Sequence, residues 1–348
     1  MDPLRNFSIT PELLRAIATI DEFKGRWAAL GNLAPERLSA LRRVATIESV
    51  GSSTRIEGVK LTDDEVEKLL SGLDIRSFRS RDEQEVAGYA ELMELIFDAF
   101  VEIPLTENHM WQLHRVMLKY SDKDEHHRGR YKKVPNRVEA FDEAGRSVAV
   151  IFETASPFDT PRLMEELLVW TRSALEVGGQ HPLLIIGVFV VRFLAIHPFQ
   201  DGNGRLVRAL TTLLLLRSGY SYVPYSSLER IVEDSKDEYY LALRRAQTTL
   251  GGDESQLIDW IGFFVRCLVR QTEVLARKIV QEKLMAPLSP LSEKLIGIVN
   301  GHGRVTVRQA VASTGANRNT IKDHLKQLVR AGRLKKCGRG RGAWYETA

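Results

Sequence analysis

The stretch IHPFQDGNGRLVRAL, residues 196–210, decides the interpretation of this chain, because it combines one histidine, a turn-forming segment and two arginines. The run LLIIGVFVVRFLA at 183–195 precedes it and predicts a helix that is buried on all sides. Proline disfavours helical backbone in the preceding residue, so His197 before Pro198 marks the end of that helix. The glycines of DGNG permit positive φ and bring successive backbone N–H groups to one side. A second helix follows, and its N-terminus predicts an anion-binding loop.

The side chains around this loop suit phosphate chemistry. Arg205 and Arg208 are three residues apart and share one helix face, and each can donate bidentate hydrogen bonds to phosphate oxygens. Asp201 at the lip can hold Mg²⁺. His197, whose ordinary pKa is about 6.5, can be neutral and accept a proton from an attacking hydroxyl. The alternatives are a helix-end histidine bonded to backbone and an ordinary turn. The residues after the last glycine exclude a Walker A loop, and the lack of a preceding strand excludes a dinucleotide fingerprint.

Composition indicates a globular protein of two domains, or of one domain with an appendage. The chain has 348 residues and 44% apolar content, which can fill a sizeable core. Its two cysteines, Cys267 and Cys337, lie far apart, which argues against a disulfide framework or a zinc site. The first residues lack a signal-peptide pattern, and Arg192 interrupts the most apolar run. We expect a cytoplasmic location and no membrane partner.

The pattern of apolar residues predicts a mainly α fold. Apolar residues recur at three and four positions through most of the first 285 residues, and Thr62 with Glu65 has the spacing of a capping box. β-Branched and aromatic residues on both sides of DEAG predict a hairpin within 130–155. The predicted helices lie at 11–30, 36–50, 61–73, 83–100, 106–118, 160–177, 183–195, 205–219, 237–250 and 255–284.

The stretch HPFQDGNGRLVR, residues 197–208, resembles the signature HPFx[DE]GNGRxxR of the Fic family at every defined position. Most members of this family transfer AMP from ATP to a Ser, Thr or Tyr hydroxyl of a protein. The resemblance covers roughly residues 40–285. It implies a Fic-type helical core with a β-hairpin flap, ATP and Mg²⁺ as cofactors, and a protein substrate, which can be the chain itself.

The resemblance also implies a role for individual residues. His197 is then the general base, Phe199 the anchor of the loop, and Asp201 the Mg²⁺ ligand. The implied phosphate-binding and ATP-binding residues are Gly202, Asn203, Gly204, Arg205 and Arg208, with Tyr240, Leu243 and Gln247 on the adenine side. The alternative for each adenine-side residue is a core position on a helix. The implied flap residues, which hold a target peptide by strand pairing, are Val150, Ile151, Phe152, Glu153 and Thr154.

A second motif, SSTRIEG at 52–58, has two interpretations. Its spacing alone allows a capping box between Thr54 and Glu57, after a helix that ends near Val50. The stretch also resembles the inhibitory pattern of the family, [ST]xxxE[GN], here Ser53 to Gly58. The resemblance implies that Glu57 pairs with Arg208 and blocks the γ-phosphate of ATP, so that the enzyme inhibits itself.

The C-terminal segment 286–348 differs in charge from the rest. It holds twelve Lys or Arg and three acidic residues, a net charge of +9, while the whole chain carries +4. Pro287 and Pro290 mark its start, and three short helices precede two strands around a basic, glycine-rich tip. This order resembles a winged helix-turn-helix domain, which implies DNA binding; protein docking and a merely solvated basic domain are the alternatives. The implied DNA-binding residues are Arg318, Asn319, Lys322 and Lys326 on the third helix and Arg339 and Arg341 on the wing.

The predicted organisation therefore has three parts: an N-terminal helical region with the inhibitory motif at 1–95, a catalytic domain at 96–285 and a winged helix-turn-helix domain at 286–348. Two other functions stay open, an ATP-sensing transcription regulator and an enzyme that removes AMP with Glu57 positioning water. The presence of His197 and Asp201 favours a transferase, because a sensor needs no base. The sequence does not specify the oligomeric state, and a homodimer stays open.

Overall fold

The computed structural model describes residues 2–5, 7–29, 35–72, 78, 80–141, 147–246, 257–285, 289–330, 333–338 and 343–347. The chain divides into two compact units, Met1–Val274 and Leu275–Ala348. The predicted boundaries at residues 95 and 285 stay predictions.

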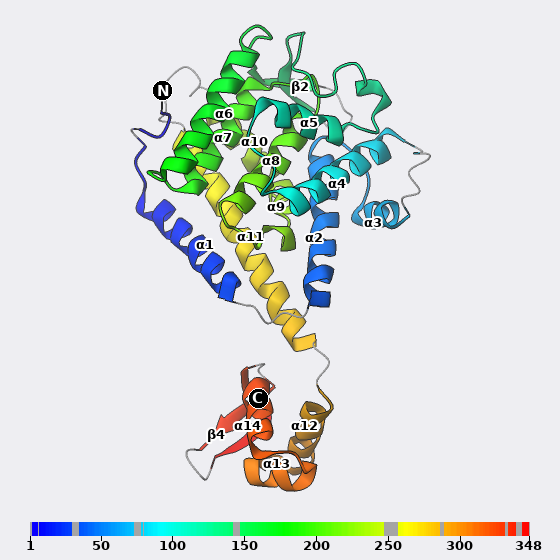
Figure 1. Cartoon of the computed structure of the whole chain (residues 1–348), viewed down its shortest axis with the longest axis vertical. Helices are drawn as coiled ribbons and strands as arrows, with labels where there is room; N and C mark the ends of the chain where they lie inside the picture. Colours follow the sequence, from blue (N-terminus) through cyan, green and yellow to red (C-terminus); the bar gives the residue numbers. More distant parts are fainter. Residues whose placement is uncertain are drawn as a thin grey trace. The chain divides into compact units, whose positions relative to one another are not determined.

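The first unit is built mainly of helices, which confirms the predicted fold class. Short 3₁₀ turns lie at Asp122–Asp124 and Val223–Tyr225. The helices are α1 (Pro11–Ala29), α2 (Pro35–Ile56), α3 (Asp63–Ser71), α4 (Arg81–Ala99), α5 (Glu107–Met117), α6 (Thr160–Val177), α7 (Pro182–Ile196), α8 (Asn203–Arg217), α9 (Leu228–Glu233), α10 (Lys236–Ala246) and α11 (Leu257–Met285), which continues into the second unit (Figure 1).

Helices α7 and α8 form the core that carries the loop between them. Nearly every residue of α7 is buried, as its continuous apolar sequence predicts, and the helix packs against α6 and α8. Gly187 of α7 lets α11 approach closely, because a Cβ there would lie 2.6 Å from the Cδ1 of Ile261. The indole Nε1 of Trp260 donates to the carbonyl of Gly187 at 2.7 Å. The loop after α7 therefore starts from a rigid, tightly packed helix.

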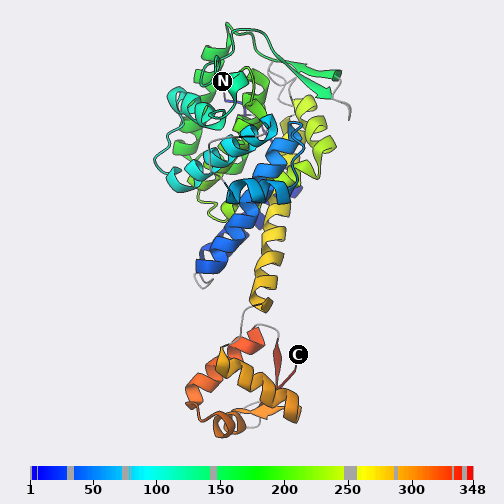
Figure 2. The same ribbon diagram turned by 90° about the vertical axis from the view of Figure 1, so that its right-hand side faces the viewer.

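The predicted hairpin is present. Strand β1 (Arg137–Phe141) pairs antiparallel with β2 (Ser147–Glu153), with Arg137 opposite Glu153 and Val138 opposite Phe152. The hairpin lies at one end of the unit in Figure 2, where β2 contacts α10. Residues 142–146, which include all of DEAG, lie outside the described residues.

The second unit has its own core and its own small sheet. Its elements are α12 (Pro290–His302), β3 (Val305–Thr306), α13 (Val307–Thr314), α14 (Arg318–Arg330), β4 (Leu334–Cys337) and β5 (Trp344–Thr347). The strands are ordered β3-β5-β4, and the buried side chains include Leu295, Ile321 and Leu325. Three helices and two of the strands match the prediction. Strand β3 was not predicted, because two residues carry no alternating pattern.

The end of α2 differs from the prediction. The helix continues to Ile56 instead of ending near Val50, so the serine and threonine of the second motif lie inside it. The Oγ1 of Thr54 donates to the carbonyls of Val50 and Gly51, at 2.8 and 3.0 Å, and caps no helix N-terminus. The capping box proposed at Thr54 and Glu57 is therefore wrong. The capping box at Thr62 and Glu65 is confirmed, since both of its hydrogen bonds are present at the start of α3.

Within the described part of the chain, no helix has both the length and the apolar character needed to cross a membrane.

Close packing between α4 and α5 gives a test of the fold. A Cβ at Gly88 of α4 would collide with the backbone carbonyl of Met117, whereas a Cβ at Gly25 of α1 would meet no atom within 4 Å. We expect Gly88→Ala to lower the free energy of unfolding by about 1–3 kcal/mol. The control Gly25→Ala should raise it by roughly 0.5–1 kcal/mol, because alanine is the better helix former. Urea denaturation measures both, and equal effects would contradict this packing.

Candidate active site

Two left-handed residues shape the loop between α7 and α8. His197 ends α7 with φ of 52° and is the only non-glycine residue with positive φ among those described, and Gly202 precedes α8 with φ of 80°. Asn203 closes the loop between them, because its Oδ1 accepts from the N–H of Phe199 at 2.9 Å and its Nδ2 donates to the carbonyl of Phe199 at 2.8 Å. The amide side chain of Asn203 thus closes the loop through two hydrogen bonds to the backbone of Phe199.

The predicted anchor, Phe199, is fully buried and stacks on the imidazole of His114 with ring centroids 3.9 Å apart. The Nδ1 of His114 accepts from the N–H of Gly129 at 2.9 Å, so its Nε2 carries the proton and donates to the carbonyl of Asp201 at 3.0 Å. Burial lowers the pKa of His114 to about 4, so this contact involves a neutral ring. Sequence reasoning missed His114; the available signal was a histidine on the apolar face of a predicted helix.

A network around the buried Lys132 joins the base of the hairpin to the same loop. The Nζ of Lys132 donates to the carbonyl of Ile196 at 3.0 Å, to Asn136 Oδ1 at 2.8 Å and to Thr154 Oγ1 at 2.9 Å. Asn136 in turn donates to the carbonyl of Phe199 at 2.8 Å. Burial lowers the pKa of Lys132 to about 8. The hydroxyl of Thr154, a predicted docking residue, therefore points into this network.

The other predicted docking residues, Val150 to Glu153, lie in β2 with their backbone paired to β1. The described sheet has two strands, so the second edge of β2 carries backbone groups that β1 does not bind. Their side chains lie outside the described residues.

The imidazole of His197 is prepared to accept a proton. Its Nδ1 lies 3.1 Å from the carbonyl of Leu194, and a carbonyl can only accept, so the proton is on Nδ1 and Nε2 keeps its lone pair. Burial lowers the pKa of His197 to about 4, and the positive charge of Lys132 acts in the same direction. His197 is therefore neutral at physiological pH.

Asp201 is ionised at the lip of the loop. Its Oδ1 accepts from the N–H of Gly202 at 2.6 Å, and guanidinium nitrogens of Arg205 and Arg81 lie 3.5 Å from its two oxygens. Burial alone would raise the pKa of Asp201, but Arg205 and the Gly202 N–H outweigh it and hold the pKa below its usual value. No group of three or more His, Cys, Asp or Glu gathers within the described ranges. A single ionised carboxylate fits Mg²⁺, which keeps several waters and takes its other ligands from phosphates.

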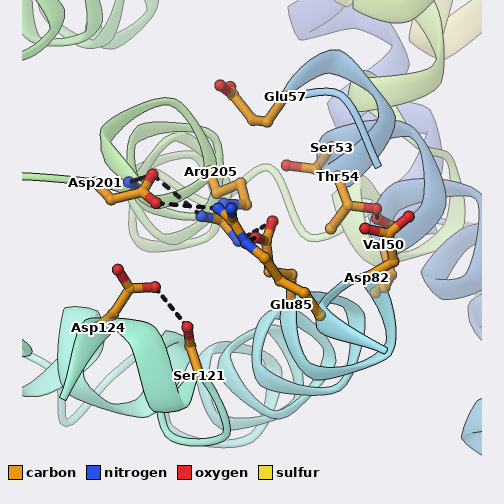
Figure 3. Close-up of polar contacts among 12 residues, drawn as sticks. Val50, Ser53, Thr54, Glu57, Asp82, Glu85, Ser121, Asp124, Asp201 and Arg205 are labelled. Atoms are coloured by element: carbon orange, nitrogen blue, oxygen red, sulfur yellow. Dashed lines mark hydrogen bonds and ion pairs between the residues drawn. The ribbon is translucent and has the colours of Figure 1, made fainter. Parts of the chain in front are cut away.

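Arg205 is enclosed in ion pairs. Only 1% of this residue is exposed, and its Nη1 donates to Glu85 Oε2 at 2.8 Å. Glu85 is itself buried and accepts from the Nε of Arg81 at 2.6 Å. Figure 3 shows Arg205 of α8 between Asp201 and Glu85 of α4. The two arginines that were predicted to act together therefore point to different partners. Glu85 was missed by sequence reasoning, because nothing in α4 indicates a partner 120 residues away.

Arg208 pairs with the second motif, as the resemblance implies. Its Nη2 donates to Glu57 Oε1 at 2.7 Å and to the carbonyl of Ser53 at 2.8 Å, and its Nε donates to Ser53 Oγ at 2.9 Å. Burial alone would lower the pKa of Arg208, but the Glu57 carboxylate outweighs it and raises the pKa. A Cβ on Gly204 would collide with Glu57 Oε1. The carboxylate of Glu57 thus lies over the first turn of α8, where an anion is expected.

The three residues predicted to lie on the adenine side differ in their surroundings. Tyr240 of α10 is half-buried, and burial together with the negative charge of Glu57 raises its pKa. Leu243 is buried, with 3% exposed, in the core beneath. Gln247 lies outside the described residues.

In the second unit, the predicted groove-binding residues of α14 are all exposed, while the apolar residues Ile321, Leu325 and Leu328 are buried. The two wing arginines lie outside the described residues. The exposed set is Arg318, Asn319, Lys322 and Lys326.

The arrangement defines a class of protein: a helical domain in which the loop between α7 and α8 carries a neutral histidine and an ionised aspartate beside a buried arginine. Residues 104–215 match the model of the Fic/DOC family, so this part of the chain belongs to that family. Residues 275–344 match a family described as a bacterial protein of unknown function.

The relatives agree with this assignment. The chain is 26% identical over 258 residues to a protein adenylyltransferase Fic of Drosophila grimshawi, and 28% identical over 237 residues to that of Drosophila persimilis. The first alignment covers 73% of this chain and 47% of the relative, so the chain spans about half the length of the curated relatives it matches.

Two solved structures share the fold. A Fic family protein from Desulfovibrio desulfuricans G20 has a TM-score of 0.63 at 24% identity and covers 98% of this chain and 97% of that one. A Fic domain containing signaling protein from Bacteroides thetaiotaomicron has a TM-score of 0.61 at 24% identity, and the match covers 74% of this chain and 96% of that one.

The lowered pKa of His114 gives a test of its neutral state. The folded pKa of about 4 lies below the unfolded value of about 6.5, so the unfolded chain binds more protons and stability is lost as pH falls through this window. Between pH 7 and pH 5, we expect the free energy of unfolding to fall by about 2 kcal/mol more in the wild type than in His114→Gln, because glutamine cannot titrate. The exposed control His302→Gln should lose as much as the wild type. Urea unfolding at both pH values measures this, and equal losses in all three proteins would contradict a neutral, buried His114.

Proposed function

We propose that this chain is a protein adenylyltransferase that transfers AMP from ATP to a Ser, Thr or Tyr hydroxyl of a protein, and that Glu57 inhibits it. The observation that carries the proposal is His197, a neutral imidazole whose Nε2 lone pair is available beside the anion-binding loop. The Drosophila relatives are named protein adenylyltransferase Fic, which supports the same reaction.

In the proposed reaction, a substrate hydroxyl attacks the α-phosphorus of ATP in line, the new O–P bond forms, and the bond to pyrophosphate breaks. The Nε2 of His197 takes the hydroxyl proton, which a positioned base can do with a gain of about 10²–10⁴ in rate. The backbone N–H groups of Asn203 and Gly204, at the N-terminus of α8, stabilise the developing negative charge, while the N–H of Gly202 is bound by Asp201. Asp201 would hold Mg²⁺, which supplies charge neutralisation to the phosphates.

Strand pairing is the proposed way of presenting the target. A target segment that pairs with the second edge of β2 gains backbone hydrogen bonds without a fixed sequence. The network of Lys132, Asn136 and Thr154 joins this hairpin to the loop of His197, so a peptide on β2 has a defined position relative to the base.

The inhibition proposed for Glu57 follows from charge and space. Arg208 is buried and needs an anion, and Glu57 supplies one directly above Gly204. While the carboxylate is there, a phosphate of ATP has neither the space nor the positive charge of Arg208. ATP can then bind only in a pose that misaligns its α-phosphate.

Labelled ATP tests the reaction. In a Glu57→Gly background we expect Mg²⁺-dependent covalent labelling of protein from α-³²P-ATP and none from γ-³²P-ATP, because the proposed leaving group is pyrophosphate. His197→Ala should abolish the labelling, while the exposed control His302→Ala should keep it. Equal labelling from the γ position would indicate a kinase. Release of AMP from a labelled protein without incorporation would favour the AMP-removing alternative, and ATP binding without either reaction would favour the sensor.

DNA binding by the second unit is a second candidate function, which the exposed polar face of α14 favours. If this face contacts phosphates, the affinity of the full chain for duplex DNA should fall steeply with salt. Replacing both Lys322 and Lys326 by alanine should reduce the slope of log K against log salt by about 2. The control pair, the exposed Lys60 and Lys68 of the first unit, should leave the slope unchanged. Fluorescence anisotropy measures this, and binding that is absent or insensitive to salt would favour protein docking.

A further inference from the structure

Glu57 reaches the anion-binding loop from the very end of α2. The helix ends at Ile56, and the N–H groups of Glu57 and Gly58 donate to the carbonyls of Thr54 and Arg55, at 3.0 Å each. Gly58 then takes a φ of 99° and the chain turns away. The position of the Glu57 carboxylate therefore depends on how firmly this last turn of α2 is attached to its surroundings.

Arg55, two residues before Glu57, attaches that turn to α9 and to the start of α3. Its Nε and Nη2 contact the two carboxylate oxygens of Glu233 at 2.6 and 3.0 Å, a bidentate pair. Nη2 also lies 3.0 Å from Asp63 Oδ1, and Nη1 donates to the carbonyl of Leu61 at 2.9 Å. Only 19% of the Arg55 side chain and 21% of the Glu233 side chain are exposed, so water screens this pair less than an ordinary surface ion pair.

The surroundings are fitted to this guanidinium. Glycine inside a helix costs about 1 kcal/mol relative to alanine, yet α2 has glycine at position 51. A Cβ there would lie 2.6 Å from the Nη1 of Arg55 and 2.8 Å from Asp63 Oδ1. Arg230 of α9 also pairs with Asp63 and with Glu233, the latter at 3.5 Å, so two arginines and two acids balance one another. We name these four residues, Arg55, Asp63, Arg230 and Glu233, the Arg55 network.

Different residues in the last turn of α2 contact α8 and the Arg55 network. Ser53 and Glu57 bond to Arg208 of α8, while Arg55 bonds to Glu233 of α9. Among the described residues, no hydrogen bond or ion pair joins Arg55 or Glu233 to the loop between α7 and α8. A substitution of Glu233 can therefore weaken the attachment of α2 to α9 without removing a hydrogen bond of the loop between α7 and α8.

We infer that Arg55 is a positioning residue that keeps the Glu57 carboxylate paired with Arg208 beside the anion-binding loop. The Glu233 carboxylate of α9 sets how strongly Arg55 does so. The inference rests on the proposed inhibition by Glu57. Physically, the bidentate pair favours the arrangement in which the last turn of α2 is seated, and removing its charge shifts the population toward arrangements in which Arg208 is free for a phosphate.

The test is Glu233→Gln, which keeps the shape of the side chain and removes its charge. We expect the initial rate of AMP incorporation from α-³²P-ATP at saturating ATP to rise roughly 5- to 30-fold in an otherwise wild-type chain. In a Glu57→Gly background the same substitution should change nothing, because no inhibitory carboxylate remains to be positioned. The control Glu67→Gln on α3 removes an acid from an exposed pair with Arg43 of α2 and should be silent in both backgrounds.

Hydrogen exchange supplies a readout that needs no activity. The amides of Glu57, Gly58 and Val59 all bond to carbonyls in the last turn of α2, and they should exchange faster in Glu233→Gln than in the wild type or in Glu67→Gln. Unchanged exchange would overturn the inference. An equal rise in rate in both backgrounds would also overturn it, since Glu233 would then act on the chemistry. If Glu57→Gly incorporates no AMP, the proposed function fails, and exchange alone decides whether Arg55 positions Glu57.

Discussion

The structure of the site depends on one constraint: a buried arginine must have an anion. Arg208 is 7% exposed, and leaving its guanidinium unpaired there would cost several kcal/mol. Ser53 supplies neutral acceptors, and Glu57 supplies the charge. Because a carboxylate and a phosphate meet the same requirement, the proposed function makes Arg208 both a group that binds ATP and the group through which Glu57 competes with ATP. The length of α2 and the absence of a side chain at Gly204 follow from bringing that carboxylate to that place.

The rest of the site holds a loop that contains a strained residue. His197 has a left-handed backbone, which costs free energy in a residue with a Cβ. Three buried side chains hold the loop in that shape: Asn203 from within, His114 from α5 and Lys132 from the base of the hairpin. Burial lowers the pKa of both His114 and His197, so the ring that holds the loop and the ring that would accept the proton are neutral together. Lys132 adds a positive charge that disfavours protonation of His197.

Much of this could be predicted from the sequence, because it is encoded locally. The buried α7, the turn at DGNG, the start of α8, the hairpin and the capping box at Thr62 each depend on residues within a few positions of one another. The pairing of Glu57 with Arg208 came only from the family resemblance. The end of α2 could not be predicted, because Ser53 makes its contacts with Arg208, 155 residues away. Glu85, which encloses Arg205, likewise acts across 120 residues.

The most direct test of the central claim compares initial rates of AMP incorporation at saturating ATP for the wild type, Glu57→Gly and Glu57→Gly/Arg208→Ala. If the carboxylate excludes a productively bound phosphate by occupying Arg208, the single variant should be faster than the wild type by at least about tenfold, the factor that 1.4 kcal/mol gives. The double variant should lose that gain, because the freed arginine is the group that seats the phosphate. An unchanged or lower rate in Glu57→Gly, or a gain that survives the loss of Arg208, would contradict the account.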